Sequence, residues 1–188
     1  MKRLFFLLLA LLVSIPVFAQ PTIPDYPARY DVGLSAAFTK NRREAVIAKL
    51  PPDALALFLN NPLRNRSNDT DFEYQPDRNT YYLTGSHEEG TFLLLAPAGV
   101  EVDGKTVKEI LFVPPRNPQT ETWNGRLFGA DRAIKELGVA LAIDNTRFEE
   151  VVGKLLDSNK FKIYHMPFQD GLEGADAPNP RWMPIITK

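Results

Sequence analysis

Two carboxylates in a polar stretch of the chain stand close enough together to act on one substrate. Asp69 and Asp71 occur in the segment 64–75, which reads RNRSNDTDFEYQ. On a single β-strand their side chains would point to the same side, about 7 Å apart at about 3.3 Å per residue. Such a pair has the chemistry for acid–base hydrolysis. The alternative is loop chemistry, in which short polar side chains bond to the nearby backbone, and the sequence leaves both open.

The remaining reactive residue types give no further catalytic or metal-ligating motif. The chain has two His and no Cys. His87 precedes Glu88 and Glu89, but no second His follows four residues later, so there is no zinc-binding HExxH helix. His87 is expected to lie in an exposed loop and His165 at the end of a strand. Nucleophile-elbow, P-loop and dinucleotide-binding motifs are also absent, so the residues alone predict no metal site.

Alternating and continuous apolar runs predict strands around the carboxylates. Phe72 and Tyr74 alternate with polar residues across 71–75, which predicts a strand. The aromatic run 81–83 is expected in the core, just before Gly85. The apolar runs 91–95 and 110–113 are typical of buried strands. They are expected to pair across the turn residues between them, where Asp103-Gly104 is a hairpin signal.

The first helix is expected to begin at Ser35 or Thr39 and to end before Pro51-Pro52. One stripe of this segment is apolar at helical spacing and would face the core. Lys40, Arg42 and Arg43 are expected to form a solvated face of the helix rather than a binding patch.

Two more helices follow, and strands alternate with them. Residues 130–138 predict a helix with a glycine stop, and Phe148 onward predicts an amphipathic helix over 146–156. Thr146 and Glu149 have the spacing of a capping box. Further short strands are expected at 54–59, 141–143 and 161–164. The pattern indicates one α/β domain over residues 35–165, with a mixed sheet flanked by helices.

The two ends of the chain differ from this domain. Residues 1–19 have the basic start, apolar middle and small cleavage-site residues of a secretory signal peptide, which predicts export to the periplasm or medium. Residues 20–34 are expected to be an extended leader, and the Pro- and Gly-rich residues 166–188 a linker. Without residues 1–19 the chain keeps 20 basic and 23 acidic side chains, a net charge of −3. This balance disfavours nucleic-acid binding, and no second stretch predicts a membrane span once the signal is cleaved.

Three motifs in order resemble a known family over roughly residues 38 to 130. They are Arg66-Ser67-Asn68-Asp69-Thr70-Asp71-Phe72, Tyr81-Tyr82-Leu83-Thr84-Gly85 and Glu121-Thr122-Trp123-Asn124-Gly125-Arg126. This order is similar to the N-terminal domain of Xaa-Pro aminopeptidases (aminopeptidase P), which prolidase and creatinase share. The chain departs from the family pattern at Tyr74-Gln75-Pro76-Asp77 and at Ser86-His87-Glu88-Glu89-Gly90.

The resemblance implies a fold, a reaction and partners. It implies a mixed sheet with a ribonuclease H-like motif, followed in the full enzymes by a C-terminal pita-bread catalytic domain that holds manganese. That domain removes the residue before proline from peptides with proline at the second position. By resemblance, Asp69 borders the active site, Arg66 orients Asp69 or its neighbours, and Trp123 reaches the substrate cleft of a neighbouring subunit. These three residues are therefore the expected substrate-binding residues, and a homo-oligomer is expected. The alternative for Trp123 is an aromatic folded onto its own domain.

Three hypotheses follow from the sequence. The first is the non-catalytic N-terminal domain of an exported, manganese-dependent Xaa-Pro aminopeptidase, with the metal site outside this chain. The second is a stand-alone periplasmic peptide-binding module of the same fold. The third is an independent hydrolase that uses Asp69 and Asp71. Under the first hypothesis this chain binds no metal itself, and its 166–188 linker leads toward a missing catalytic domain.

Overall fold

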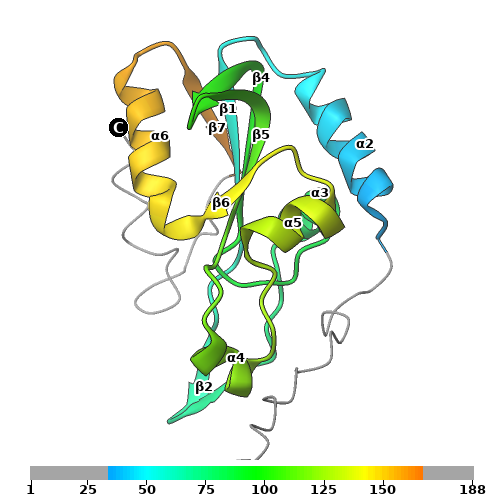
Figure 1. The fold of residues 1–188 in the computed structure, drawn as a ribbon, viewed down its shortest axis with the longest axis vertical. Helices are drawn as coiled ribbons and strands as arrows, with labels where there is room; N and C mark the ends of the chain where they lie inside the picture. Colours follow the sequence, from blue (N-terminus) through cyan, green and yellow to red (C-terminus); the bar gives the residue numbers. More distant parts are fainter. Residues whose placement is uncertain (1–33, 167–188) are drawn as a thin grey trace, which may run out of the picture.

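The computed structural model describes residues 34–166, which form a mixed β-sheet with helices on both faces (Figure 1). The predicted signal peptide, all of the leader before residue 34 and the linker beyond Met166 lie outside the described residues. In chain order the elements are α2 (Ala36–Ile47), β1 (Ala54–Leu59), β2 (Asn65–Ser67), β3 (Thr70–Asp71), α3 (Arg78–Thr84), β4 (Phe92–Val102), β5 (Lys105–Val113), α4 (Pro118–Asn124), α5 (Gly129–Leu137), β6 (Ala142–Asp144), the 3-10 turn η1 (Asn145–Arg147), α6 (Phe148–Asp157) and β7 (Lys162–His165).

The main sheet has the strand order β6-β5-β4-β1-β7. The β4–β5 hairpin and the β1–β4 pair are antiparallel. The two edge strands pair in parallel, β6 with β5 and β7 with β1. The predicted pairing of the 91–95 and 110–113 runs is confirmed, with Leu94 opposite Ile110. The hairpin turn is tighter than expected, because β4 continues to Val102 and only Asp103 and Gly104 turn the chain, both with positive φ. The predicted mixed α/β sheet is therefore confirmed.

The alternation of side chains along each strand divides the core between the two faces of the sheet. Leu94 and Phe112 point to the face that α6 covers, where Phe148, Val151 and Val152 pack against them. Leu93 and Leu111 point to the opposite face, which the side chains of α3 and α5 cover. Because both faces are covered, β1 and the second half of β5, Ile110 to Val113, consist of apolar residues.

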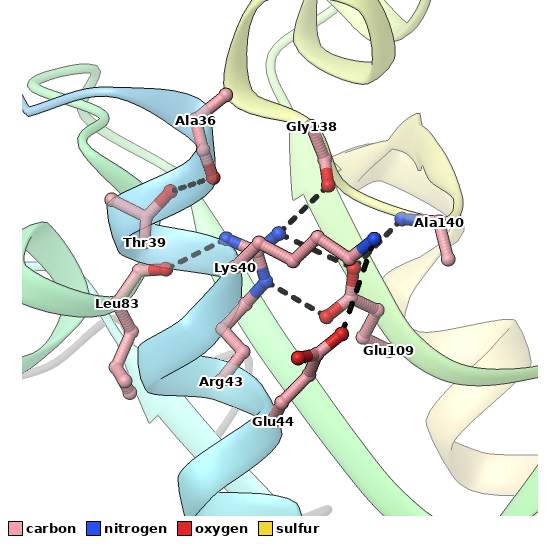
Figure 2. Close-up of polar contacts among 9 residues, drawn as sticks. All are labelled: Ala36, Thr39, Lys40, Arg43, Glu44, Leu83, Glu109, Gly138 and Ala140. Atoms are coloured by element: carbon pink, nitrogen blue, oxygen red, sulfur yellow. Dashed lines mark hydrogen bonds and ion pairs between the residues drawn. The ribbon is translucent and has the colours of Figure 1, made fainter.

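A buried ion pair joins α2 to the sheet (Figure 2). Arg43 is 0% exposed and Glu109 of β5 is 7% exposed. Arg43 Nε donates to Glu109 Oε2 at 2.8 Å, and the same guanidinium donates to the carbonyls of Leu83 and Gly138 at 2.9 Å each. Glu109 Oε1 also accepts the N–H of Ala140 at 2.8 Å. One side chain thus satisfies carbonyls at the C-terminal ends of α3 and α5.

The prediction that Arg43 lies on a solvated face is wrong, although Lys40 and Arg42 are exposed as expected. Helical spacing places Arg43 on the same stripe as Thr39, and these are the two buried residues of α2. The side of the domain that this stripe meets is polar at this point, because two helix ends and a carboxylate converge there. An arginine fits that environment better than an aliphatic side chain.

The capping box predicted for the last helix is also wrong. Thr146 lies inside η1, and α6 begins at Phe148 without any side-chain hydrogen bond to its cap. Arg147, the residue before α6, instead donates to both carboxylate oxygens of Asp103 in the β4–β5 turn, at 2.7 and 2.9 Å. A tertiary ion pair therefore fixes the start of α6 where the sequence indicated a local cap.

Candidate functional site

The polar stretch of the chain forms a small hairpin that projects from the domain. β2 and β3 pair in antiparallel fashion, and Asn68 takes a left-handed conformation with φ 51° in the turn between them. The side-chain amide of Asn65 donates to the carbonyls of Asn68 and Thr70 and to Asp71 Oδ1, at 3.0, 3.3 and 3.1 Å. One asparagine thus holds the hairpin closed from inside.

The two candidate carboxylates occupy different parts of this hairpin. Asp69 lies exposed in the turn, and Asp71 lies exposed in β3 with its Oδ1 bound to the Asn65 amide. They therefore do not face one another along a single strand, as an acid–base pair on one strand requires. Local loop chemistry describes Asp71, and Asp69 presents its carboxylate to solvent.

Arg66 in β2 contacts an aromatic ring rather than Asp69. Its guanidinium carbon lies 6.0 Å from the centre of the Phe72 ring, at the outer limit of a cation–π contact. Among the described residues, no ion pair joins Arg66 to Asp69. Phe72 is 55% exposed, so the hairpin shows an arginine, an aromatic ring and a carboxylate to solvent together.

The strand predicted at 71–75 ends at Asp71; the Phe72 N–H still donates to the Arg64 carbonyl at 2.9 Å, and residues 73–77 belong to no strand. The alternation is a consequence of a different packing: Tyr74 turns inward and its hydroxyl donates to the Asn61 carbonyl at 3.0 Å. Burial holds the pKa of Tyr74 above its ordinary value. The segment lines an open groove of about 890 Å³ whose walls are Asn61, Pro62, Arg64 and residues 72–79.

Trp123 lies on the short helix α4, with 87% of its surface exposed. Asn117 caps this helix by accepting the N–H of Gln119, and Pro118 occupies its first turn. The alternative that Trp123 folds onto its own domain is therefore wrong. Figure 1 shows α4 and the β2–β3 hairpin at the same end of the long axis, away from the helices that cover the sheet.

A polar cluster holds α4 at its base. Arg116 donates to both carboxylate oxygens of Glu121 at 3.0 and 2.8 Å, and this bond holds the pKa of Glu121 below its ordinary value. The Arg116 side chain also crosses Gly129, the first residue of α5, so closely that a Cβ there would lie 2.7 Å from Arg116 Cγ. Gly129 has φ +62°, which also favours glycine.

Glu88 also belongs to this cluster, where it faces the charges of Glu121 and Arg132, and no sequence motif points to it. Its Oε1 accepts the N–H of Phe128 at 2.6 Å, just before α5, while Oε2 is buried without a hydrogen-bond partner. Burial, which outweighs the opposing effects of the Phe128 N–H and Arg132, raises the pKa of Glu88 to about 7. The sequence alone predicts no role for Glu88, because its partner Phe128 lies 40 positions later in the chain.

The histidines and tyrosines near this cluster differ in part from expectation. His87 is half-buried, with its ring centre 4.4 Å from the Tyr81 ring centre in an edge-on contact, and burial lowers the pKa of His87. The expected exposed loop position is wrong for His87, whereas His165 does lie at the exposed end of β7. Tyr82 is 46% exposed rather than in the core, and it packs edge-on against Phe38 beneath Arg42.

Between residues 34 and 166, no three His, Asp or Glu side chains gather closely enough to hold a metal ion. The manganese that the resemblance implies therefore has no fitting ligand set among them, and no chemical step is assigned to such an ion. Nor does any helix in this range combine the length and apolar character needed to cross a bilayer.

Comparison with known proteins places this geometry in a family. The model of the aminopeptidase P N-terminal domain matches residues 39–164. Xaa-Pro aminopeptidase of Haemophilus influenzae is 34% identical over 128 residues, which cover 68% of this chain and 28% of that protein. Human Xaa-Pro aminopeptidase 3 is 35% identical over 106 residues, covering 55% of this chain and 20% of that protein.

A solved structure agrees with these sequence matches. Aminopeptidase P from E. coli with the inhibitor Pro-Leu aligns with a TM-score of 0.65 and 28% identity, over 82% of this chain and 32% of that one. The chain thus spans about a third or less of the length of these relatives. The match over residues 39–164 and the shared fold show that this chain belongs to the aminopeptidase P N-terminal domain family.

Proposed function

We propose that this chain serves as the N-terminal domain of an exported, manganese-dependent Xaa-Pro aminopeptidase. In this role it borders the peptide-binding cleft of a C-terminal pita-bread domain, which holds the metal ions. The substrates are peptides with proline at the second position, and the residue before proline is released. The chain's own residues bind and orient peptide rather than activate water.

The observation that carries this proposal is the placement of Asp69 and Trp123 at one end of the domain, both exposed. Asp69 occupies the tip of a hairpin that Asn65 closes, so its carboxylate is presented in a fixed turn. Trp123 stands on a capped helix and offers a large, rigid contact surface. A carboxylate can bind the cationic amino terminus of a peptide, and an exposed tryptophan can pack on proline or on a neighbouring subunit.

The test supplies a catalytic domain and measures hydrolysis. The chain replaces the N-terminal domain of the Haemophilus influenzae relative in a chimera, which is assayed on an Xaa-Pro peptide with Mn²⁺. Asp69→Asn and Trp123→Ala are each expected to lower kcat/KM by about tenfold or more, which is the loss of one good contact. The matched controls are Asp157→Asn and Tyr164→Ala, an exposed carboxylate and an exposed aromatic elsewhere on the domain. An inactive chimera, or two site variants as active as their controls, contradicts the proposal.

The groove along residues 61–62, 64 and 72–79 favours a second candidate, a stand-alone periplasmic peptide-binding module. Its volume of about 890 Å³ lies within the range of ordinary ligand sites. Calorimetric titration of Xaa-Pro peptides into the 188-residue chain alone separates the two. Micromolar binding that Phe72→Ala abolishes supports the module, and its absence favours a domain that needs a catalytic partner. Turnover by the chain alone that Asp69→Ala abolishes would instead support the independent hydrolase.

A further inference from the structure

The Glu88 side chain crosses from one part of the domain to another. Its backbone N–H donates to Ser86 Oγ at 3.2 Å and its carbonyl accepts the Asn60 side-chain amide at 2.9 Å. With the backbone fixed on both sides, its carboxyl group reaches Phe128, whose N–H it accepts at 2.6 Å. This bond connects the loop between α3 and β4 with the junction between α4 and α5, residues 125–128.

The same junction is held on its other side by Arg116. That side chain pairs with Glu121 of α4 and packs across Gly129 of α5. Residues 125–128 join α4, which bears Trp123, to α5. This segment is therefore fixed between two side chains, Arg116 and Glu88. A change in either contact alters how α4 stands on the domain.

The environment of the Glu88 carboxyl group is unfavourable for a charge. Oε2 is inaccessible to solvent and accepts no hydrogen bond. The charges that face the group are Arg132 from α5, which favours ionisation, and Glu121 from α4, which opposes it. Arg126, in the junction itself, acts on Glu121, and His87 is the neighbouring residue in its own loop. Burial dominates and raises the pKa of Glu88 to about 7.

We propose that Glu88 is a positioning residue whose carboxyl group holds the α4–α5 junction against the α3–β4 loop and loosens it on ionisation. The neutral carboxyl group still accepts the Phe128 N–H and leaves no charge on the buried Oε2. Ionisation places an unsolvated charge there, which outweighs the stronger charge-assisted bond to Phe128 and is relieved when the junction opens to water. The inference rests on the proposed function only in giving the orientation of Trp123 a use in peptide binding.

The test uses the full chain with Trp182→Phe, so that Trp123 is the only tryptophan. The protection factor of the Phe128 amide and the fluorescence of Trp123 are followed from about pH 5.5 to 8.5. In the parent protein both are expected to change together near pH 7, with protection about tenfold greater below the transition than above it. Glu101→Gln, which removes an exposed carboxylate on β4, is expected to leave both curves unchanged.

Two variants at Glu88 separate the effect of its protonation from the effect of its side-chain length. Glu88→Gln keeps the length and an acceptor oxygen but has no proton to lose, so both curves become flat. Glu88→Asp still titrates but is shorter by one methylene, so Phe128 protection at pH 5.5 falls about tenfold. A transition that persists in Glu88→Gln belongs to another group such as His87 and overturns the proposal, as does unchanged protection in Glu88→Asp. Neither readout measures hydrolysis, so a failure of the proposed function is recognised separately in the chimera assay.

Discussion

A charged residue occupies the innermost position of α2 because three other elements supply its partners. The guanidinium of Arg43 donates to Glu109 of β5 and to carbonyls at the ends of α3 and α5. Without Arg43 the buried Glu109 carboxylate would keep only the Ala140 N–H, and both carbonyls would lose the guanidinium as a donor, which is costly. The ion pair therefore fixes how the three helices stand on this face of the sheet.

Removing one partner of this pair is expected to be strongly destabilising. Arg43→Met leaves the Glu109 carboxylate buried and unpaired, and should lower the free energy of unfolding by about 3–5 kcal/mol in urea denaturation. The control Arg42→Met changes the neighbouring exposed residue, whose guanidinium lies 4.8 Å from the Phe38 ring centre, and should cost about 1 kcal/mol or less.

The double variant Arg43→Met with Glu109→Leu tests whether the cost comes from the unpaired charge. Replacing both members by apolar residues should recover part of the loss, although the carbonyls of Leu83 and Gly138 stay unsatisfied. If the two single costs simply add in the double variant, Arg43 and Glu109 are not energetically coupled and this account of α2 is wrong.

The Glu88 carboxyl group is expected to make the stability of the domain depend on pH. Its pKa rises from an ordinary 4.5 to about 7 on folding, so the folded chain binds this proton more tightly. Below pH 4.5 both states carry the proton, and as the pH rises toward 7 the free energy of unfolding falls by about 3 kcal/mol. Glu88→Gln removes this loss, so urea denaturation should show it to be more stable than the parent at pH 8, by more than at pH 5. An equal difference at both pH values contradicts the assignment.

At the scale of elements, a long-range contact replaces a local signal at the start of α6. The spacing of Thr146 and Glu149 is that of a capping box. In the structure residues 145–147 instead form η1, and Arg147 pairs with Asp103. Thr146→Ala should therefore change the free energy of unfolding by less than about 0.5 kcal/mol. Ser35→Ala is the matched comparison, because the Ser35 hydroxyl does accept the Phe38 N–H at 3.2 Å. Ser35→Ala should lower the free energy of unfolding by about 1 kcal/mol. If thermal unfolding shows Thr146→Ala to be the more destabilising of the two, Thr146 does cap α6.

The strands and helices were predictable wherever burial is continuous or amphipathic. The runs at 54–59 and 110–113 are apolar because both faces of the sheet are covered, and such a pattern survives in the sequence. Gly138 likewise marks the left-handed end of α5. The alternation at Phe72 and Tyr74 wrongly predicted a strand: Tyr74 is half-buried, Phe72 is exposed, and neither belongs to a strand.

The candidate site could be predicted only where the family motifs carry it. Asp69 and Trp123 stand in motif positions, and the structure finds both exposed. Glu88 and Arg43 act through partners 40 and 66 residues away, and neither spacing nor residue type announces such contacts. Long-range polar bonds of this kind depend on topology, which a single sequence does not supply.

At the scale of the whole molecule, the described domain is one functional part, and export remains a prediction. If residues 1–19 are a signal peptide, expression in a bacterium with an active secretion system should yield a periplasmic product. Its N-terminal residue, identified by mass spectrometry, should be Gln20. A product that keeps Met1 and stays in the cytosol contradicts this prediction, and a Leu8→Arg variant, which interrupts the apolar stretch, should remain uncleaved.

The parallel pairing of β7 with β1 has a consequence for the order in which the domain is made. Ala54 to Leu57 meet Lys162 to His165, so the first strand of the sheet waits for the last one. During synthesis the ribosome releases β1 long before its partner exists. The sheet therefore stays open at that border until nearly all of the described chain has emerged, so this edge of the domain is the last part of the sheet that can close.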